Sequence, residues 1–510
     1  MSTVPQIILD DRAVTRDKLL LRARRAARGL DSLGVQESDA IAMLLRNDFA
    51  FLEASQAAAA LGAYAVPINW HGKPEEVLYV INDVKPKILV AHADLLVPLR
   101  DLLPADLQVI TVPTPAGIQK HFKITPGAAE PLPGDTVWGA WADAFEPWNE
   151  PPRRSRATMI YTSGTTGKPK GVRRLAATPE ESAAYIELLR QVYGFDDAVR
   201  AMVVGPMYHS SPNAYMRQAL PVAETLVLST KFDAEETLAF IERHRITHAV
   251  MVPTMFVRIL KLPKQVRERY DVSSLKWVVH TGAPCPVDVK KAMMDWWGPV
   301  IYETYGGTEA GTATLCTPQE WLAHPGTVGK LTPGARMAIY GDNGEVLPEG
   351  EIGEIYMRVP AYADFTYLNN EAKRKEVERD GLVSCGDIGY VRDGFLYLCD
   401  RRADMVISGG VNIYPAEIEA ALLQCPGVHD CAVFGIPDED FGESLAAAIE
   451  VMPGQTLTAA EVKTFLEQHL AKYKVPRRID FHATLPREDS GKIFKRRLRD
   501  PFWATAGRSI

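Results

Sequence analysis

The sequence predicts an α/β protein with a large N-terminal body of doubly wound mixed or parallel sheets, a small β unit and a C-terminal α+β domain. Three observations carry this prediction. Helical and strand-like segments alternate at the start of the chain, polar loops follow several apolar runs in the middle, and turn signals crowd together after Gly341. Strands that alternate with amphipathic helices are typical of β-α-β units in a parallel sheet.

The alternation begins with a helix over residues 16–33. Its apolar side chains recur on one helical face, and Gly34 is a residue that ends helices. The segment 40–45 contains only apolar residues, which favours a buried strand. The same rhythm continues with a helix at 50–62 and strands at 63–69, 85–92 and 107–112.

Four apolar runs in the middle of the chain each end in a loop of small and polar residues. Parallel sheets bind ligands beyond the carboxyl ends of their strands, so the side chains after these runs are candidate site residues. An amphipathic segment with an acidic first turn is expected to be helical within 232–244. The four runs are 201–211, 248–256, 275–286 and 299–311.

Strands become shorter and turn signals more frequent in the last third of the sequence. Asp-Asn-Gly, Glu-Gly and Asp-Gly turns between short alternating strands predict a small antiparallel β unit that begins near residue 330. Residues 404–510 predict a compact α+β domain with helices at 415–423 and 459–473. The boundary is expected at 400–404, which gives an N-terminal domain of residues 1–402 and a C-terminal domain of residues 403–510.

The composition excludes several classes of protein. The 510 residues include 57 Lys and Arg against 64 Asp and Glu, and this net charge of −7 argues against a general nucleic-acid binder. The six cysteines form no CxxC pair and no zinc-ligand spacing. Asp10 and Asp11 come too early for a signal peptide, and the most apolar window, 54–68, is too short to span a bilayer. We therefore expect a cytoplasmic protein without a membrane span.

The strongest motif is YTSGTTGKPKGV at residues 161–172, directly after an apolar strand. Glycines let backbone N–H groups approach an anion closely, and hydroxyls and lysines add donors and positive charge. The motif therefore predicts a phosphate-binding loop. It is not a Walker A loop, because only two residues separate Gly164 from Gly167 and Pro169 follows the lysine.

This loop resembles the signature loop of the adenylate-forming superfamily, which includes acyl-CoA synthetases, aryl-CoA ligases, luciferases and peptide-synthetase adenylation domains. Six further segments resemble other motifs of that family in the expected order, and the likeness covers about residues 15–500. These segments are GPMYHSS (205–211), YETYGGTEA (302–310), GEIYMR (353–358), CGDIGY (385–390), DRRADMVISGGVNIYPAEIE (400–419) and PREDSGKIFKRRL (486–498).

The resemblance implies a reaction in two steps. ATP and Mg²⁺ first activate a carboxylic acid to an acyl-adenylate with release of pyrophosphate, and the acyl group then passes to a thiol, commonly that of coenzyme A. Cations and N–H donors aimed at the phosphates are what the first step needs. The resemblance also implies that residues 403–510 form a mobile lid that swings about a hinge at Ala403, where the family usually has Lys or Asp.

The resemblance assigns roles to individual residues. Lys492 is implied as the catalytic lysine, Glu309 as the magnesium ligand, Thr308 as a phosphate contact and His209 as a gate between the acyl and thiol channels. Tyr305 is implied to stack on adenine, Asp387 and Arg401 to bind ribose, and 408–410 to line the pantetheine tunnel. The full set implied to bind the nucleotide or coenzyme A is Thr162, Ser163, Gly164, Thr165, Thr166, Gly167, Lys168, Gly282, Ala283, Pro284, Tyr305, Gly306, Asp387, Arg401, Ser408, Gly409 and Gly410.

Structural interpretations of the same residues stand beside these roles. Without the family, Lys492 is a surface lysine on a solvated basic face that includes Lys495, and Asp387 is a turn residue. The Thr308-Glu309 pair is then a helix cap, 408–410 a plain glycine turn, and His209 a structural residue. Tyr208, Asn213, Met255 and Phe256 line either a mostly apolar acid site or the core.

The sequence as a whole predicts an ATP- and Mg²⁺-dependent ligase that activates a hydrophobic or aromatic carboxylic acid and transfers it to coenzyme A. An amide-forming ligase that passes the acyl-adenylate to an amine is the alternative, because Ala403 departs from the usual hinge residue. A scaffold that has lost catalysis is disfavoured, because Lys492, Glu309 and Asp387 are all present. The expected partners are small molecules, not nucleic acids or membranes, and the expected state is a monomer or homodimer.

Overall fold

The computed structural model describes residues 4–505, apart from 155, 163–168, 197, 403, 410 and 488–492. The chain divides into two compact units, each made of more than one segment. Unit 1 consists of Met1–Ala323, Leu331–Arg336 and Arg358–Val383. Unit 2 consists of His324–Lys330, Met337–Met357 and Ser384–Ile510.

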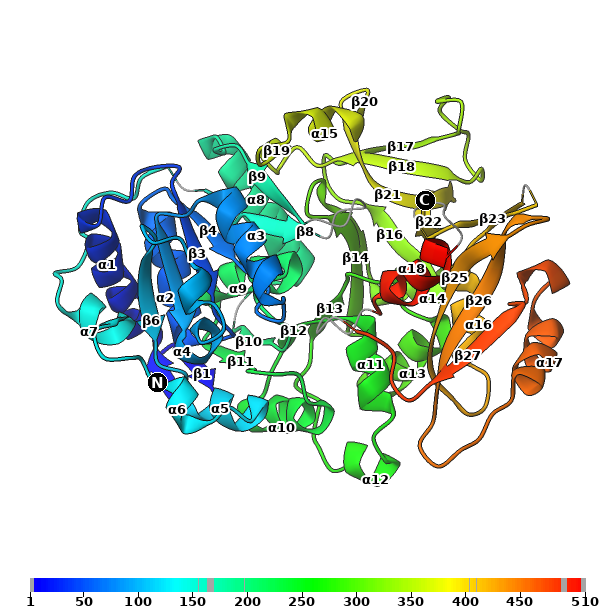
Figure 1. Cartoon of the computed structure of the whole chain (residues 1–510), viewed down its shortest axis with the longest axis horizontal. Helices are drawn as coiled ribbons and strands as arrows, with labels where there is room; N and C mark the ends of the chain where they lie inside the picture. The colour runs from blue at the N-terminus through cyan, green and yellow to red at the C-terminus, as the bar shows by residue number, and fades with distance from the viewer. Residues whose placement is uncertain are drawn as a thin grey trace. The chain divides into compact units, whose positions relative to one another are not determined.

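Unit 1 begins with a five-stranded parallel sheet, drawn in blue and cyan in Figure 1. The strands run in the order β4-β3-β5-β6-β7, and all neighbours pair in parallel. The central strands are buried from end to end, which explains their continuous apolar runs. The strands are β3 (Ala40–Leu44), β4 (Tyr64–Pro67), β5 (Ile88–His92), β6 (Gln108–Val112) and β7 (Thr136–Val137).

Helices complete the β-α-β units of this sheet. Helix α1 (Arg16–Ser32) starts where the Thr15 hydroxyl accepts a hydrogen bond from the backbone N–H of Lys18, and it buries its apolar face. It ends just before Gly34, whose φ of +81° suits a residue without a side chain. Helices α2 (Phe49–Ala60) and α3 (Pro74–Val84) follow β3 and β4.

The second sheet of unit 1 is parallel in its centre and antiparallel at its edges. Its order within the unit is β15-β14-β13-β12-β10-β11-β1-β2. At the edges, β15 pairs antiparallel with β14 and β2 pairs antiparallel with β1. The other neighbouring strands pair in parallel. The strands are β1 (Gln6–Leu9), β2 (Arg12–Thr15), β10 (Arg200–Val203), β11 (Thr225–Leu228), β12 (His248–Met251), β13 (Trp277–His280), β14 (Ile301–Gly307) and β15 (Gly311–Cys316).

The helices that connect these strands form the main core of unit 1 with them. Helix α10 (Ala234–His244) shows why the sequence is helical there: the Asp233 carboxylate accepts hydrogen bonds from two first-turn N–H groups, and the apolar face is buried. The other helices around this core are α11 (Pro253–Leu260) and α13 (Val287–Trp297). Helix α9 (Ser210–Val222) packs against β10 and β12.

A small antiparallel sheet completes unit 1. Its order is β19-β9-β8, with β8 (Ile160–Thr162), β9 (Lys170–Arg174) and β19 (Phe365–Tyr367). Tyr367 pairs with Val172, so a strand near residue 366 lies beside the strand that follows the signature loop. This sheet therefore connects the loop to a part of the chain almost 200 residues later.

Unit 2 contains the predicted β unit and the C-terminal α+β domain. Strands of the β unit follow the order β17-β18-β21-β22-β16. Its longest pair, β21 (Leu382–Arg392) and β22 (Phe395–Arg401), is antiparallel and joined by a short Asp-Gly turn. The other strands are β16 (Thr327–Leu331), β17 (Arg336–Tyr340) and β18 (Gly353–Arg358).

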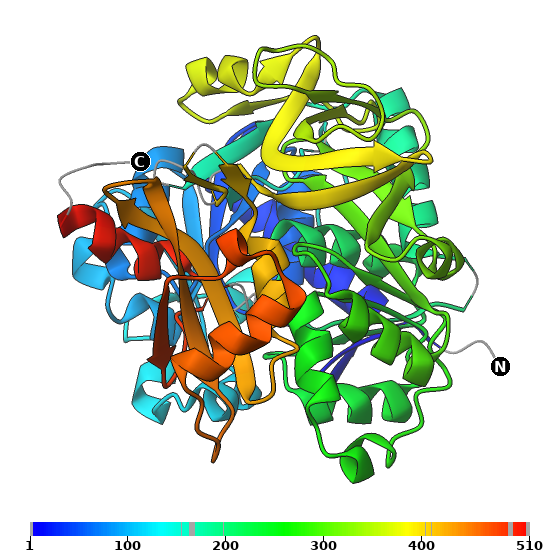
Figure 2. The same cartoon turned by 90° about the vertical axis from the view of Figure 1, so that its right-hand side faces the viewer.

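The C-terminal sheet has an apolar face on each side, with alternate residues of β26 pointing to opposite faces. Leu445, Ala447 and Ile449 pack against helices α16 (Pro415–Leu422) and α17 (Ala459–His469). Ala446 and Ala448 instead pack towards α18 (Lys495–Thr505). Figures 1 and 2 show α18 (red) on one side of this orange sheet and α17 on the other. The strands are β23 (Val406–Ser408), β24 (Val411–Ile413), β25 (Val428–Asp438), β26 (Gly442–Val451) and β27 (Arg478–His482).

These observations confirm the predicted α/β fold class. The predicted helix at 459–473 ends at His469, because Leu470 is extended and a short 3-10 turn follows. Among the described residues, no helix is both long and apolar enough to cross a membrane.

Candidate nucleotide-binding site

A tight turn in unit 1 carries the residues assigned to phosphate and magnesium. Strands β14 and β15 pair with Gly307 opposite Gly311, so Thr308 and Glu309 lie in the turn between them. A Cβ atom at Gly306 would lie 1.9 Å from the carbonyl oxygen of Gly311, so only glycine fits there. Thr308 and Glu309 both remain partly exposed. The turn therefore presents a hydroxyl and a carboxylate from a closely packed hairpin.

Glu309 lies beside the start of the signature loop. The Tyr367 hydroxyl donates a hydrogen bond of 3.0 Å to Glu309 Oε1, and the Thr162 hydroxyl lies 3.5 Å from the same oxygen. Thr162 is the last residue of β8 and immediately precedes the loop. The remaining predicted loop residues lie outside the described residues: Ser163, Gly164, Thr165, Thr166, Gly167 and Lys168.

Lys170 adds a positive charge where the chain leaves this loop. Its Nζ lies 5.5 Å from the centre of the Tyr367 ring. Burial lowers the pKa of Lys170, Lys373 lowers it further, and the Glu309 carboxylate opposes both effects. The structure thus brings the ammonium of Lys170 and the hydroxyls of Thr162 and Tyr367 together around the Glu309 carboxylate. Sequence analysis identified Thr162 and Glu309 but missed Tyr367, which carries no motif of its own.

The donor set fits a magnesium ion. Mg²⁺ is commonly bound by one or two carboxylates together with water and substrate phosphates. Glu309 supplies one partly exposed carboxylate, one of whose oxygens is held by Tyr367. Within the part of the chain that the structure describes, no three His, Cys, Asp or Glu side chains are grouped to hold a metal. These residues therefore suit an ion held largely by a nucleotide, and they do not suit a zinc-type centre.

The predicted adenine contacts come from two neighbouring parallel strands. Strands β13 and β14 pair with His280 opposite Glu303, so the chain beyond both points reaches the same edge of the sheet. Gly282, with a φ of +86°, opens the loop that also contains Ala283 and Pro284. Tyr305 follows on β14 and is largely buried. The fold therefore places these predicted contacts at a common edge.

A buried charged cluster lies on the strand that leads to Tyr305. Lys290 Nζ lies 2.6 Å and His280 Nε2 lies 3.3 Å from Glu303 Oε2, and all three side chains are buried. Burial raises the pKa of Glu303, but the neighbouring His280 and Lys290 outweigh it and lower the net pKa. Burial also lowers the pKa of His280. Sequence analysis did not single out this cluster, which links α13 to β14.

His209 and the residues around it were expected to border the acid site. His209 immediately precedes α9, is partly exposed, and its ring centre lies 4.3 Å from that of Tyr208. Asn213 is buried and its amide donates to a backbone carbonyl. Met255 and Phe256 belong to the main core of unit 1. The core interpretation therefore applies to Met255 and Phe256, whereas the gate role of His209 stays a prediction.

Unit 2 holds the predicted ribose contacts. Asp387 and Arg401 lie opposite each other on β21 and β22, and Arg401 Nε lies 3.5 Å from Asp387 Oδ1. Ser408 ends β23 and Gly409 follows with a φ of +57°. Three predicted residues lie outside the described part of the chain: Ala403, Gly410 and Lys492. The structure thus brings Asp387 and Arg401 together without describing the predicted catalytic lysine.

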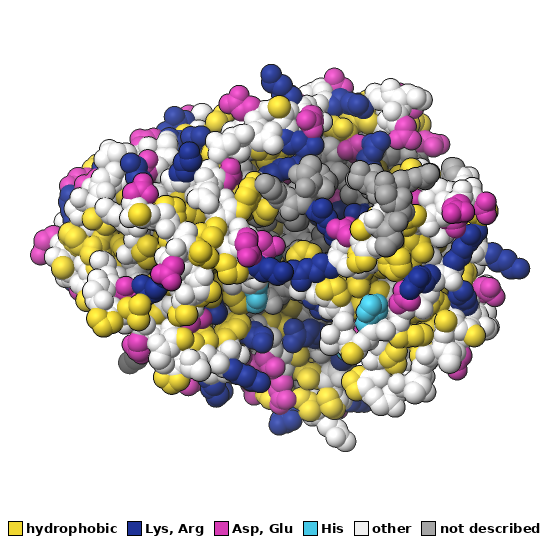
Figure 3. Space-filling view, in the orientation of Figure 1, with side chains coloured by type: hydrophobic (Ala, Val, Ile, Leu, Met, Phe, Trp, Pro, Cys, Tyr) yellow, Lys and Arg dark blue, Asp and Glu magenta, His cyan; other side chains and the backbone are white. Residues whose placement is uncertain are grey.

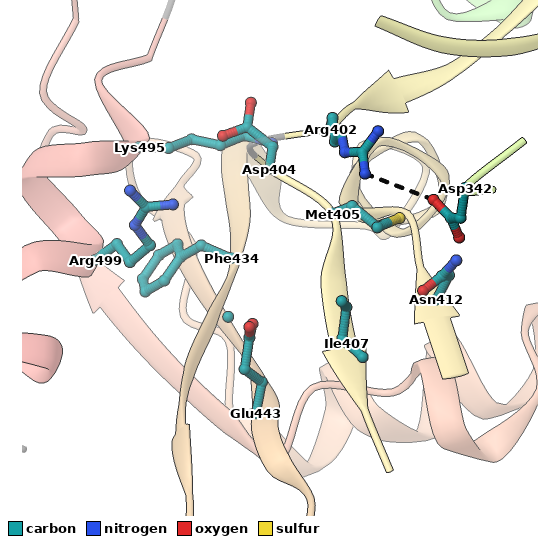
Figure 4. A pocket seen from close by; sticks show the side chains of 11 residues that line it. Asp342, Arg402, Asp404, Met405, Ile407, Asn412, Phe434, Glu443, Lys495 and Arg499 are labelled. Atoms are coloured by element: carbon teal, nitrogen blue, oxygen red, sulfur yellow. Dashed lines mark ion pairs between the residues drawn. The ribbon is translucent and has the colours of Figure 1, made fainter. Parts of the chain in front are cut away.

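A cavity of about 250 Å³, lined by both charged and apolar side chains, lies within unit 2 beside the predicted hinge (Figure 4). Arg402 points to Asp342, 3.5 Å away, and pairs with Glu354 at 2.6 Å. Lys495 pairs with Glu419 at 2.8 Å. Burial lowers the pKa of Lys495, but neighbouring carboxylates outweigh it and raise the net pKa. The expectation of a solvated surface position for Lys495 is therefore wrong, because this lysine joins α18 to α16.

Comparison with known proteins finds two family models that match this chain. A family model described as "AMP-binding enzyme" matches residues 3–364, and one described as "AMP-binding enzyme C-terminal domain" matches residues 417–492. A feruloyl-CoA synthase from Amycolatopsis sp is 32% identical over 498 residues, which span 96% of this chain and 94% of the relative.

Two solved structures are similar over nearly the whole chain. The amide bond synthetase McbA from Marinactinospora thermotolerans is 25% identical with a TM-score of 0.82, covering 98% of this chain and 97% of that one. The ATP-bound MatB from Rhodopseudomonas palustris is 27% identical with a TM-score of 0.83, covering 98% and 96%. Together with the family models, these likenesses show that the chain belongs to the adenylate-forming superfamily of AMP-binding enzymes and is an AMP-forming ligase of the acyl-CoA synthetase branch.

Proposed function

We propose that this ligase uses ATP and Mg²⁺ to activate a hydrophobic or aromatic carboxylic acid, and then transfers the acyl group from the acyl-adenylate to coenzyme A. One structural observation carries the proposal: Glu309 lies within hydrogen-bonding reach of Thr162 and Tyr367, beside the signature loop. The likeness to a feruloyl-CoA synthase supports an aromatic acid and coenzyme A as acceptor. The cytoplasmic location and the oligomeric state stay predictions from the sequence.

The residues divide the first step between them. Glu309 would hold Mg²⁺, and Thr308 and the loop residues would bind the phosphates as negative charge builds up on the leaving pyrophosphate. Magnesium, when bound, neutralises part of that charge. Asp387 offers two acceptor oxygens for the ribose hydroxyls, and Lys492 would bring a cation to the carboxylate and the α-phosphate. His209 and residues 408–410 would then border the path of the thiol.

A screen for pyrophosphate release tests the proposed function. Purified enzyme, ATP and Mg²⁺ are incubated with aliphatic, aryl and polycyclic acids, each with and without coenzyme A. We expect release with hydrophobic or aromatic acids, and conversion to the acyl-CoA thioester only when coenzyme A is present. The proposal fails if no acid in these classes releases pyrophosphate, or if acyl-adenylate forms and coenzyme A never accepts it.

An amide-forming ligase is the second candidate. The likeness to an amide bond synthetase favours it, and Ala403 lacks the polar side chain usual at the hinge. An amine would then replace the thiol as the nucleophile that attacks the acyl-adenylate. The same screen separates the two functions when each acid is supplied with an amine in place of coenzyme A, because only one acceptor will consume the adenylate rapidly.

The role proposed for Lys492 predicts a separation of the two half-reactions. In K492A we expect acyl-adenylate formation to fall by at least ~10²-fold, because the variant loses a cation aimed at developing charge. Thioester formation from supplied acyl-adenylate should stay within about threefold of wild type. Pyrophosphate exchange measures the first half-reaction and acyl-CoA chromatography the second. R496A, at an exposed arginine of α18 that pairs with Asp500, is the control for a general loss of basic charge. Equal survival of both half-reactions in K492A would remove the lysine from catalysis.

A further inference from the structure

Arg174 contacts the backbone of the turn that contains Thr308 and Glu309. It is the last residue of β9, the strand that leaves the signature loop. Its Nη2 donates hydrogen bonds of 2.7 Å and 2.9 Å to the carbonyl oxygens of Thr308 and Glu309. Its Nη1 donates a third, of 2.8 Å, to the carbonyl of Ala363. One guanidinium therefore joins three backbone segments of unit 1.

The guanidinium lies in a site built to hold it. Burial lowers the pKa of Arg174, so the surroundings must offset the cost of desolvating a charge. The three carbonyl dipoles do so, together with the ring of Tyr362, whose centre lies 4.9 Å from the guanidinium carbon. Tyr362 in turn packs edge-on against Tyr185, with ring centres 4.9 Å apart.

Tyr362 also fixes the far end of the same turn. Its hydroxyl lies 3.1 Å from the hydroxyl of Thr312, and a Cβ atom at Gly311 would lie 2.5 Å from the ring. Gly311 has a φ of +85°, which a residue with a side chain adopts at a cost. The turn is thus held by Arg174 at its beginning and by Tyr362 at its end.

The direction of the two carbonyls has a consequence for anion binding. In a planar trans peptide the N–H points away from the C=O. Because the carbonyls of Thr308 and Glu309 both point to Arg174, the N–H groups of Glu309 and Ala310 point away from it. Two successive N–H groups turned the same way form a concavity suited to an anion. The cation behind the carbonyls polarises both peptides in the favourable sense.

We propose that Arg174 is a positioning residue for the β- and γ-phosphates of ATP and their magnesium ion, acting through the Thr308–Glu309 turn. This inference rests on the proposed use of ATP and Mg²⁺ and extends it to a residue that touches neither. Arg174 fixes the two peptide planes, and these planes fix where the Glu309 carboxylate and the two N–H groups point. It also ties β9, the strand that follows the signature loop, to the turn.

The variant R174K tests this role, because lysine keeps the charge but lacks the planar fork that serves three carbonyls at once. The readout is calorimetric binding of a non-hydrolysable ATP analogue with Mg²⁺, compared with binding of AMP, which lacks the β- and γ-phosphates. We expect R174K to weaken the Mg²⁺–ATP analogue about tenfold or more and AMP by no more than about threefold. In turnover, kcat/KM for ATP should fall by about 10–100-fold, the scale of a displaced catalytic group.

Two arginines serve as matched controls. Arg173 is the neighbour of Arg174 on β9, and its guanidinium carbon lies 5.4 Å from the ring centre of Tyr64. Arg154 also donates to backbone carbonyls, those of Ala176 and Ala177, at an exposed position. R173K and R154K should leave the affinities for both nucleotides unchanged.

The outcomes separate this inference from the proposed function. Equal affinities of R174K and wild type for the Mg²⁺–ATP analogue would overturn the inference, as would an equal loss for analogue and AMP. A selective loss in R174K upholds it even if no tested acid is activated, which would instead defeat the proposed acid class. If R174K does not fold, Y362L removes the ring over the guanidinium while Arg174 stays, and the same selective loss, about threefold, is then required.

Discussion

At the scale of single residues, Glu309 is the centre of the candidate site. Its Oε1 is held by the Tyr367 hydroxyl at 3.0 Å, so the carboxylate is oriented before any ligand arrives. A carboxylate oriented in advance loses less conformational freedom when it binds a metal. The charge of Glu309, and not only its shape, should therefore decide how the enzyme responds to Mg²⁺.

The variant E309Q keeps the size of the side chain and removes its charge. Because glutamine binds Mg²⁺ poorly, we expect half-maximal turnover to need about tenfold more Mg²⁺, and kcat/KM to fall by about 10²-fold at low Mg²⁺. A Mg²⁺ titration of pyrophosphate release measures both. E320Q, which alters the cap of a helix at Thr317, should titrate like wild type. An unchanged Mg²⁺ requirement in E309Q would contradict the assignment.

The sequence predicted individual site residues wherever a motif marked them. Thr162 and Glu309 were predicted because their segments resemble motifs of the adenylate-forming superfamily, and the structure brings these two together. Arg174 and Tyr367 were missed, because an arginine ending a strand and a tyrosine far along the chain have no pattern of their own. Their roles depend on the pairing of β9 with β19, a contact between segments distant in sequence.

At the scale of elements, the link between α13 and β14 supports the site. Lys290 and Glu303 form a buried ion pair at 2.6 Å, and the ammonium lies 5.0 Å from the centre of the Trp321 ring. Removing one partner of a buried pair leaves the other charge uncompensated, which costs about 3–5 kcal/mol of stability. The stability of β14, which carries Tyr305, therefore depends on the charge of Lys290 in α13.

The variant K290M tests this dependence through its effect on stability against pH. In wild type the pKa of Glu303 is lowered, so the pair stabilises the fold above the unfolded pKa and loses this effect as pH falls through the folded pKa. In K290M the buried carboxyl keeps His280 beside it but loses the ammonium, so its pKa should be raised and stability should decline as pH rises through about 4–7. Chemical unfolding at several pH values measures both curves. K291M, which breaks an exposed pair with Asp295, is the control.

A loss of about 3–5 kcal/mol is expected for K290M at pH 7, with part of the loss recovered near pH 4.5. K291M should lose less than about 1 kcal/mol, because exposed pairs contribute little. A K290M protein as stable as wild type at pH 7, or equally destabilised at every pH, would contradict the view that Lys290 keeps Glu303 ionised.

Element prediction succeeded where local chemistry decides structure. The cap at Asp233 and the capping box at Thr458 begin two of the predicted helices through contacts within one turn. Sheet order was not predictable in this way. The first strand pairs with β11, with Ile7 opposite Leu226, and no local pattern encodes such a pairing. Apolar runs predict that strands are buried, but not which strand lies next to which.

At the scale of the whole molecule, the net charge says little about the ligands. The value of −7 suggests an acidic protein, yet Figure 3 shows many Lys and Arg side chains exposed alongside the acidic ones. Local cations act over about 8–10 Å at ordinary ionic strength, so their arrangement and not the total decides anion binding. An acidic enzyme can therefore bind ATP and coenzyme A without a basic isoelectric point.

The two proposed half-reactions, adenylation and then thioester formation, place a demand on the whole molecule. If residues 403–510 must swing between adenylation and thioester formation, the backbone at Ala403 must change its dihedral angles. Proline fixes φ near −65° and also restricts the residue before it, whereas glycine widens the choice of angles. We therefore expect A403P to retain pyrophosphate exchange within about threefold and to lose at least ~10²-fold in acyl-CoA formation, and A403G to retain both half-reactions.

A403P and A403G also distinguish the two candidate functions, because they test whether residues 403–510 must move between the half-reactions. An enzyme that passes its acyl-adenylate to a small amine can react without lining a tunnel for a long thiol, so A403P should leave amide formation nearly intact. Equal rates of acyl-CoA formation in A403P and A403G would show that the hinge lies elsewhere. Loss of both half-reactions in A403P, with a normal unfolding transition, would instead mean that residue 403 must be flexible for adenylation as well.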